Sequence, residues 1–318
     1  MNIAILGATS HIAKGLIERF LNLGAHHLHL FSRSQDRVRQ FLAASGASDS
    51  ADCTVHAGYQ SFAAQRHDVI INCIGVETRN KHNCDFTRYF SVTEEFDALV
   101  LSYLQEIKPD ALYISFSSGA VYGKGFSAPA AAASVNAVRV NQLAPEDFYG
   151  IARINAEAKH RAHGNLRIVD LRIFSYFSRY ITLTDGYFIT DVMEAILGDK
   201  LLVTDTSDMV RDYLHPDDLF AMILSCIRAG KLNRALDVNS KAPVSKQEIL
   251  DYFAAQYGLK YERRQFSENA SATGAKSNYF STCNQACQMG YAPQFSSMDG
   301  LKDVAGDILN VIDGRKRS

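Results

Sequence analysis

The sequence predicts an α/β fold built on a doubly wound parallel sheet, with a smaller α+β region in the C-terminal half. Short apolar runs typical of buried strands alternate with helical patterns over residues 2–174. The first run ends at Gly7, where a tight turn leads into a helix. Beyond this part the pattern is less regular. We therefore divide the chain into a main domain, residues 1–175, and a smaller region, residues 176–318, from which some strands or helices return to the main domain.

The predicted strands of the main domain are short and apolar, as expected of strands buried on both faces. They cover residues 2–6, 28–31, 68–74, 111–116 and 166–174. Apolar side chains at helical spacing lie between them and predict helices over residues 12–23, 90–104 and 148–162. Alternating strands and helices indicate a parallel sheet with helices on both faces.

The second half of the chain is predicted to contain helices at residues 188–197, 216–229 and 245–257. Residues 124–147, in contrast, include an alanine-rich stretch bounded by Pro129 and Pro145. Loops of this length are often functional. We expect either a mobile loop beside a functional site or a connecting segment with no function of its own.

Composition excludes several classes of function. The net charge is −1 at pH 7, so no global field favours nucleic acid or an acidic membrane. No apolar run approaches the roughly 18 residues needed to span a bilayer. The six cysteines are scattered in a chain with no secretory leader, which predicts reduced thiols and a cytoplasmic protein. Cys283 and Cys287 have no second pair beside them, so no metal site is predicted.

The turn after the first strand is a candidate phosphate-binding loop. Backbone N–H groups at a helix start, together with the helix dipole, form a pyrophosphate site. Such loops normally contain three glycines, but here small residues, Ser10 and Ala13, follow Gly7. We therefore interpret residues 1–175 as a Rossmann-type dinucleotide-binding domain and residues 176–318 as the substrate-binding region. The loop residues expected to bind the cofactor are Gly7, Thr9, Ser10, His11 and Ile12.

The end of the second strand favours NADP(H) over NAD. A fold that uses NAD typically has an acidic residue there for the ribose hydroxyls. This chain has Ser32 and Arg33 instead, which suit a 2′-phosphate. The competing interpretation is a solvated arginine at a strand end.

A serine, a tyrosine and an arginine form the candidate catalytic group. Tyr149 and Arg153 are four residues apart, so they share one face of the predicted helix. A cation there favours the phenolate and makes the tyrosine a better acid and base. Ser118, upstream, could hold the substrate oxygen that gains or loses the proton. Alternatively, Arg153 only pairs with Glu157 along the helix.

Together these stretches resemble the extended short-chain dehydrogenase/reductases of the NAD-dependent epimerase/dehydratase family, which act largely on nucleotide-linked sugars. The similar stretches are residues 7–13, 68–75, 114–123, 149–157, 170–174, 211–219 and 237–245, in the family's order. The resemblance implies that Ser118 and Tyr149 are catalytic, that Ser118 also binds the substrate, and that Arg153 occupies the position of a catalytic lysine. It also implies that Arg211 binds the diphosphate of the sugar nucleotide.

The remaining cofactor contacts implied by the resemblance are Cys73, Gly75, Tyr149 and Arg153. An asparagine of the family's proton relay is missing or replaced near residues 91–93. Family members often dimerise through the helix that bears the catalytic tyrosine, so we expect a homodimer, and a role in polysaccharide biosynthesis.

The residues after Ser118 narrow the reaction. Dehydratases of the family have an acidic pair there, whereas this chain has Gly119 and Ala120, which cannot transfer a proton. We therefore predict an NADPH-dependent reductase of a 4-keto nucleotide-linked deoxysugar, with Tyr149 as general acid. The alternative is a C4 epimerase using NAD(P). A second alternative is a dinucleotide-binding sensor that has lost catalysis, suggested by the altered loop and Arg153.

Overall fold

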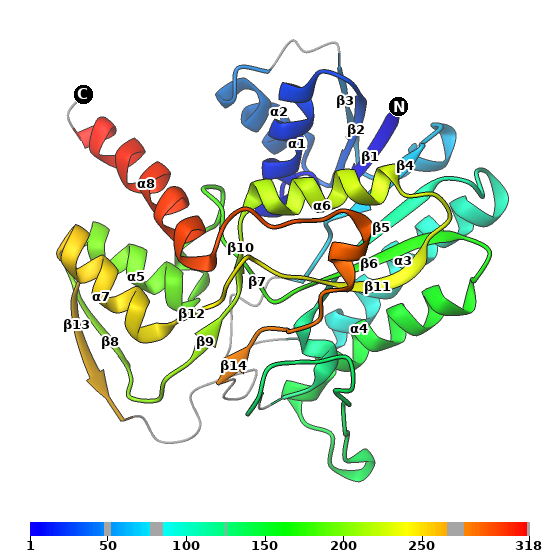
Figure 1. Cartoon of the computed structure of the whole chain (residues 1–318). Coiled ribbons are helices and arrows are strands. Elements are labelled where there is room, and N and C mark those ends of the chain that lie inside the picture. The colour runs from blue at the N-terminus through cyan, green and yellow to red at the C-terminus, as the bar shows by residue number, and fades with distance from the viewer. Residues whose placement is uncertain (48–51, 77–84, 125, 266–276, 317–318) are drawn as a thin grey trace.

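The structure is a computed structural model that describes residues 1–47, 52–76, 85–124, 126–265 and 277–316, with side chains through residue 310. In this part of the chain, a seven-stranded parallel sheet forms the centre of the molecule (Figure 1). Its order is β11-β6-β5-β4-β1-β2-β3. The strands are β1 Asn2–Leu6, β2 His27–Ser32, β3 Cys53–Ala57, β4 Val69–Asn72, β5 Leu112–Ser118, β6 Arg167–Ile173 and β11 Asn233–Val238.

Helices cover both faces of this sheet, and the sequence of β1 shows why. Ile3 and Ile5 point to one face and pack in a cluster with α1 and α6. Ala4 and Leu6 point to the other face and pack with α3. Side chains alternate along a strand, so a strand buried on both faces must be apolar throughout. The helices are α1 His11–Leu23, α2 Gln35–Ala44, α3 Thr87–Glu106, α4 Pro145–Ala162 and α6 Pro216–Arg228.

The C-terminal part has its own apolar cluster, formed mainly by three helices and a two-stranded parallel sheet. These elements are α5 Phe188–Leu197, α7 Lys246–Tyr257, α8 Ser297–Lys316, β8 Leu201–Asp205 and β13 Lys260–Arg264. Short strands connect the two parts: β7 Ser175–Tyr176 with β10 Tyr213–Leu214, and β12 Val244–Ser245 and β14 Asn278–Tyr279 on either side of β9 Val210–Arg211. The 3-10 turns are η1 Phe62–Ala64, η2 Gly119–Tyr122, η3 Val140–Gln142, η4 Leu183–Asp185 and η5 Gln285–Met289.

The predicted doubly wound sheet is confirmed, and every predicted strand and helix is present with small shifts at its ends. The sequence did not reveal α2, α8 or the two edge strands of the sheet. β3 (Cys53–Ala57) has half-exposed and exposed side chains, so it lacks the continuous apolar run of a buried strand. The division of the chain at residue 175 stays a prediction.

A buried histidine joins α3 and α4 to the sheet. His160 on α4 is fully buried, with its Nδ1 2.8 Å from Oδ1 of Asp170 and its Nε2 2.5 Å from Oδ1 of Asp97. Burial alone would lower the pKa of His160, but the two carboxylates outweigh it and raise the pKa to about 9. Lys159 and Arg161 complete the cluster by pairing with Asp97 and Asp170, respectively.

This cluster predicts a loss of stability at alkaline pH. The folded-state pKa of His160 is raised above its ordinary value of 6.5, so its contribution is complete below pH 6.5 and is lost as the pH rises through about 9. His160→Gln removes the imidazolium between two buried carboxylates and should cost about 3 kcal/mol of unfolding free energy near pH 6.5. Urea denaturation at pH 6.5 and 9 measures both effects. If the unfolding free energy fell by the same amount between pH 6.5 and 9 in wild type and variant, the raised pKa of His160 would be contradicted.

Candidate active site

The loop between β1 and α1 has the backbone conformation that close approach of a phosphate requires. Gly7 has φ +72°, and a Cβ there would lie 2.9 Å from Cγ1 of Ile74 and 3.1 Å from the carbonyl carbon of Cys73. Both facts restrict this position to glycine. The loop residues predicted to bind the cofactor lie together here, where backbone N–H groups at the start of α1 can face an anion.

Ser10 and His11 begin α1. The Ser10 hydroxyl caps the helix by accepting a hydrogen bond of 3.2 Å from the N–H of Ala13. The His11 ring packs edge-on against Tyr176, with centroids 5.3 Å apart. Burial, and then the charge of Lys14, lower the pKa of His11 to about 4. His11 is therefore neutral at pH 7, and the backbone supplies the attraction for an anion.

Ser32 and Arg33 lie at the end of β2 and differ in exposure. Ser32 is buried and accepts a hydrogen bond of 3.1 Å from the N–H of Ser34, whereas Arg33 is exposed. Burial raises the pKa of the Tyr59 hydroxyl, and the charge of Arg33 opposes this shift, so Arg33 is close enough to influence that phenol. On the adjoining helices, Arg37 lowers the pKa of Lys14 after burial does.

Cys73 and Gly75 lie just beyond the end of β4. Cys73 is buried, and its burial raises the pKa of its thiol. The thiol is therefore unreactive, and the residue only packs beside the loop between β1 and α1. A Cβ on Gly75 would meet no described atom within 4 Å. Of these two predicted cofactor residues, Gly75 therefore borders open space at the carboxyl edge of the sheet, whereas Cys73 is covered.

A glycine lets the helix that carries Tyr149 pack closely on the turn that follows Ser118. Ser118 ends β5 and precedes η2, while Tyr149 lies in the second turn of α4. Gly150 faces the turn: a Cβ there would lie 2.5 Å from the carbonyl oxygen of Ala120. Only a residue without a side chain allows α4 to pack this closely on η2. Sequence reasoning missed Gly150, since its role depends on this non-local contact.

Arg153 lies beside Tyr149, as predicted from their spacing. Its Cζ is 5.2 Å from the centroid of the Tyr149 ring, and its Nη1 donates to the carbonyl oxygen of Phe116 at 3.1 Å. Its Nε is buried and has no hydrogen-bond partner among the described residues. The alternative pairing with Glu157 is wrong, because Glu157 accepts hydrogen bonds from Arg172 and Ser117. Arg153 is therefore left to face the site.

Tyr279 is a site residue that the sequence did not reveal. Its hydroxyl lies 3.0 Å from Oγ of Ser118, and Cζ of Arg211 lies 5.7 Å from its ring centroid. Burial raises its pKa, and Tyr149 and Arg211 are close enough to influence that pKa. Tyr279 thus stands between the catalytic group and the predicted diphosphate residue. A lone tyrosine in an irregular stretch gives no sequence signal.

One other expectation near the site, the family asparagine, can be compared with the structure. The stretch where the family asparagine was expected contains Thr93, whose Oγ1 donates to the carbonyl oxygen of Tyr89 within α3. In the same helix, Tyr89 packs against Tyr149, with ring centroids 5.3 Å apart. Asp212, next to Arg211, accepts a hydrogen bond of 2.9 Å from the N–H of Ser240 and so supports the local fold.

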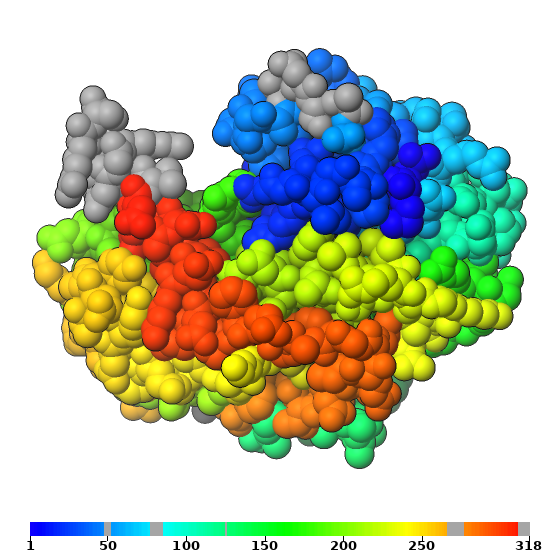
Figure 2. Space-filling model, turned by 45° about the horizontal axis from the view of Figure 1, so that its top comes forward, coloured from blue at the N-terminus to red at the C-terminus, as the bar shows by residue number. Residues whose placement is uncertain are grey.

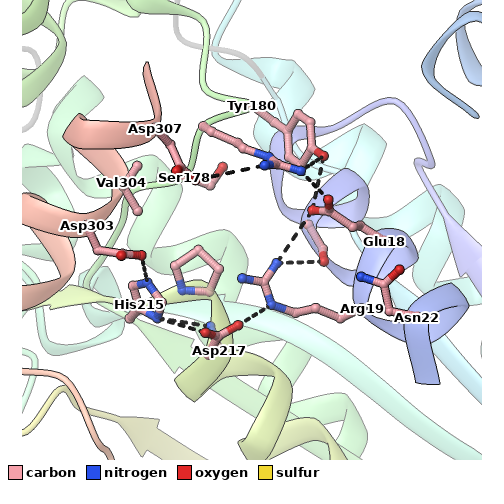
Figure 3. Close-up of a pocket in the computed structure, with 13 residues that line it drawn as sticks. Glu18, Arg19, Asn22, Ser178, Tyr180, His215, Asp217, Asp303, Val304 and Asp307 are labelled. Atoms are coloured by element: carbon pink, nitrogen blue, oxygen red, sulfur yellow. Dashed lines mark hydrogen bonds and ion pairs between the residues drawn. The ribbon is translucent and has the colours of Figure 1, made fainter. Parts of the chain in front are cut away.

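A cavity of about 260 Å³ lies away from these residues, between α1, α6 and α8 (Figure 3). It lies at the hollow between α8 and α1 visible in Figure 2. Its charges pair across the walls: Arg19 with Asp217, Arg179 with Glu18, and His215 with Asp303. Because no predicted catalytic or cofactor residue lines it, we assign this cavity to the contact between the two parts of the molecule rather than to catalysis.

The described residues contain no helix long and apolar enough to cross a bilayer. Nor do they contain a group of three or more His, Cys, Asp or Glu side chains arranged to hold a metal ion.

Comparisons with known proteins agree with this geometry. A model of the NAD dependent epimerase/dehydratase family matches residues 3–238. No curated protein matches the chain significantly. A variant of UDP-glucuronic acid 4-epimerase from Bacillus cereus, in complex with UDP-4-deoxy-4-fluoro-glucuronic acid and NAD, has a TM-score of 0.80 at 18% identity, covering 98% of this chain and 100% of that chain.

Two further structures have the same fold. UDP-glucose-4-epimerase from Stenotrophomonas maltophila, with bound NAD and formylated UDP-arabinopyranose, has a TM-score of 0.80 at 16% identity, covering 99% of each chain. dTDP-glucose 4,6-dehydratase from Streptomyces venezuelae, with NAD bound, has a TM-score of 0.76 at 16% identity, covering 96% of each chain. At these identities the likeness establishes the fold.

The contact at Gly150 predicts a difference between two glycine substitutions. Gly150→Ala places a methyl group against the Ala120 carbonyl and should lower the unfolding free energy by about 1–3 kcal/mol. Gly306→Ala is the matched control, since a Cβ there meets no atom within 4 Å on α8 and should stabilise by about 0.5–1 kcal/mol. Urea denaturation measures both. Equal effects of the two substitutions would disprove the close contact.

Proposed function

Because the chain belongs to the NAD-dependent epimerase/dehydratase family, we propose that it is an NADPH-dependent reductase of a 4-keto nucleotide-linked deoxysugar. The observation that supports reduction most directly is the exposed guanidinium of Arg33, directly after the end of β2. A 2′-phosphate would find charge-assisted donors there, where an acid would favour NAD. NADPH is the usual cofactor of net reduction.

The residues present fit such a cofactor. Gly7 to Ile12 would hold the pyrophosphate, with Gly7 giving the space that any side chain would fill. Ser32 and Arg33 would bind the 2′-phosphate. Cys73, Gly75, Tyr149 and Arg153 would border the nicotinamide half, where the buried Nε of Arg153 needs an acceptor. When bound, NADPH supplies a hydride to the keto carbon.

The side chains of the chain itself handle the proton and the substrate. Tyr149 donates its phenolic proton to the sugar oxygen, and Ser118 donates a hydrogen bond to the same oxygen. The guanidinium of Arg153, 5.2 Å from the Tyr149 ring centroid, stabilises the negative charge left on the phenol. Its second contact, to the Phe116 carbonyl, holds it there, so the arginine works as a fixed charge. Arg211 on β9 binds the diphosphate of the substrate.

A C4 epimerase is the second candidate. The same serine, tyrosine and arginine would serve it, because both reactions move a proton at a carbinol or ketone oxygen. The similar fold of epimerases solved with NAD favours this alternative. The two candidates differ in cofactor use: a reductase consumes NADPH, and an epimerase leaves its cofactor unchanged overall.

The proposal extends to the surroundings of the enzyme. We expect it to work in the cytoplasm in the biosynthesis of a polysaccharide. We also expect a homodimer through α3 and α4. Phe90 and Phe148 on these helices are half-exposed, and their ring centroids are 6.3 Å apart. An apolar face of this kind is suited to a second copy of the chain.

Absorbance at 340 nm tests the reaction. Pure protein incubated with NADPH and a dTDP- or UDP-linked 4-keto-6-deoxy sugar should oxidise NADPH stoichiometrically with substrate. Tyr149→Phe should lower turnover by at least a hundredfold and leave NADPH affinity nearly unchanged, because it removes only the proton donor. Conversion of UDP-glucose to UDP-galactose without net NADPH oxidation would identify the epimerase. Binding of NADPH with neither reaction would favour a sensor.

The cofactor preference is tested separately at Arg33. Arg33→Gln should weaken NADPH binding by roughly 10- to 100-fold, the loss of charge-assisted hydrogen bonds to a phosphate, and change NADH binding little. Arg39 is an exposed arginine on α2, so Arg39→Gln is the matched control and should change the affinity for neither NADPH nor NADH. Isothermal titration calorimetry measures the NADPH and NADH affinities of wild type and of both variants. Equal losses for NADPH and NADH at Arg33 would rule out a 2′-phosphate site.

A further inference from the structure

We propose that Tyr279 is a positioning residue for Ser118, and that Ser281 anchors the segment that carries it. The proposal deepens the function given above and rests on it for the identity of the reaction. The segment, residues 277–283, crosses from the C-terminal part of the molecule to the carboxyl edge of the main sheet. It brings one tyrosine hydroxyl to the catalytic serine.

Backbone contacts hold this segment on both sides. β14 pairs in parallel with β9, which places Tyr279 beside Arg211. On its other side the segment pairs with the alanine-rich loop: the N–H of Ala130 donates to the carbonyl oxygen of Phe280 at 2.9 Å, and the N–H of Thr282 donates to that of Ala130 at 2.8 Å. Residues 277–283 therefore fix part of the 124–147 loop beside the site.

The hydrogen bonds of Ser118 show what Tyr279 does. Oγ of Ser118 accepts a hydrogen bond of 3.2 Å from the N–H of Ala120 and lies 3.0 Å from the hydroxyl of Tyr279. The geometry of this contact allows either hydroxyl to donate, and we assign the donor role to Tyr279 because a phenol is a stronger hydrogen-bond donor than an aliphatic alcohol. A serine oxygen that accepts both bonds has its own proton left to donate. Tyr279 thereby aims the Ser118 hydroxyl at the sugar oxygen.

The ring of Tyr279 is held in place by its neighbours. It lies edge-on to Phe126 and Phe174, with centroids 4.8 and 5.1 Å away. The guanidinium of Arg211 lies over it, 5.7 Å from the centroid. One side chain thus contacts both the serine that faces the sugar oxygen and the arginine proposed to bind the diphosphate. Tyr279 therefore helps to set the distance between the two side chains, Ser118 and Arg211, that would hold opposite ends of the substrate.

Ser281 fixes the segment to the sheet. Its Oγ donates to Oδ2 of Asp237 at 2.5 Å and accepts from the N–H of Cys283 at 3.0 Å. Ser281 and Asp237 are both buried. Asp237 also accepts from the hydroxyl of Tyr122, in the turn that follows Ser118. The position of Tyr279, two residues away, therefore depends on the sheet under the catalytic turn.

Steady-state kinetics of Tyr279→Phe, with NADPH and the dTDP-linked 4-keto-6-deoxy sugar, tests the proposal. The variant keeps the ring and loses the hydroxyl, so kcat should fall about tenfold while KM stays within about twofold. Tyr291→Phe is the matched control, because it removes another buried tyrosine hydroxyl, bonded to the carbonyl oxygen of Asn239, and should leave kcat unchanged. A kcat equal to wild type in Tyr279→Phe would overturn the proposal.

A double-mutant cycle tests the anchor. Ser281→Ala should lower kcat less than Tyr279→Phe does, and the double variant should be close to Tyr279→Phe alone, because both act through the same bond. Strictly multiplicative effects would show that Ser281 does not act through Tyr279.

A stability cycle keeps this inference separate from the proposed function. Ser118→Ala and Tyr279→Phe should show a coupling of about fivefold in the equilibrium constant for unfolding, measured in urea. An inactive wild type with this coupling would refute the reductase and leave the contact standing. If the effects of the two substitutions on this constant simply multiply, Tyr279 does not position Ser118, whatever reaction the protein catalyses.

Discussion

The arrangement of the half of the molecule that holds the candidate catalytic residues depends on the half-buried guanidinium of Arg172. It extends from β6 and donates three hydrogen bonds to Glu157 on α4, the shortest of 2.5 Å. Its Nη1 donates to the hydroxyl of Tyr122 at 2.9 Å and lies 3.4 Å from Oδ1 of Asp237. Burial would lower the pKa of Arg172, but these partners raise it well above its usual range. One cation thus joins two strands, a helix and a turn.

This arrangement fixes the positions of the proposed catalytic residues relative to the sheet. Glu157 accepts a hydrogen bond of 2.6 Å from the hydroxyl of Ser117, the neighbour of Ser118. Tyr149, Arg153, Glu157 and His160 recur at spacings of four and three residues, so they share one stripe of α4. The last two fix α4 to the sheet through buried ion pairs, and the first two face the site. Buried ion pairs contribute little net stability, but removing one partner is costly, which favours a single geometry.

How much of this could be predicted depends on how local each determinant is. The alternating strands and helices, the loop at Gly7 and the spacing of Tyr149 and Arg153 are properties of short stretches, and the structure confirms their arrangement. The pairing of Arg153 with Glu157 was a plausible local alternative, but a residue of another strand, Arg172, takes the glutamate. Whether an i,i+4 pair forms depends on such competitors.

The unpredicted features all depend on distant partners. Tyr279 reaches Ser118 across 161 residues of sequence, and Gly150 matters only because a carbonyl group of η2 lies against it. β3 and β11 are edge strands with polar residues, so their membership in the sheet is decided by their neighbours. A single sequence contains no record of these contacts.

The turnover of Arg172→Lys shows whether Arg172 organises the proposed catalytic residues. Lysine keeps the charge but cannot reach Glu157, Tyr122 and Asp237 together. We expect a folded protein that has the cofactor affinity of wild type but turns over at least tenfold more slowly, in whichever of the two proposed reactions wild type performs. Normal turnover in Arg172→Lys would contradict this role of Arg172.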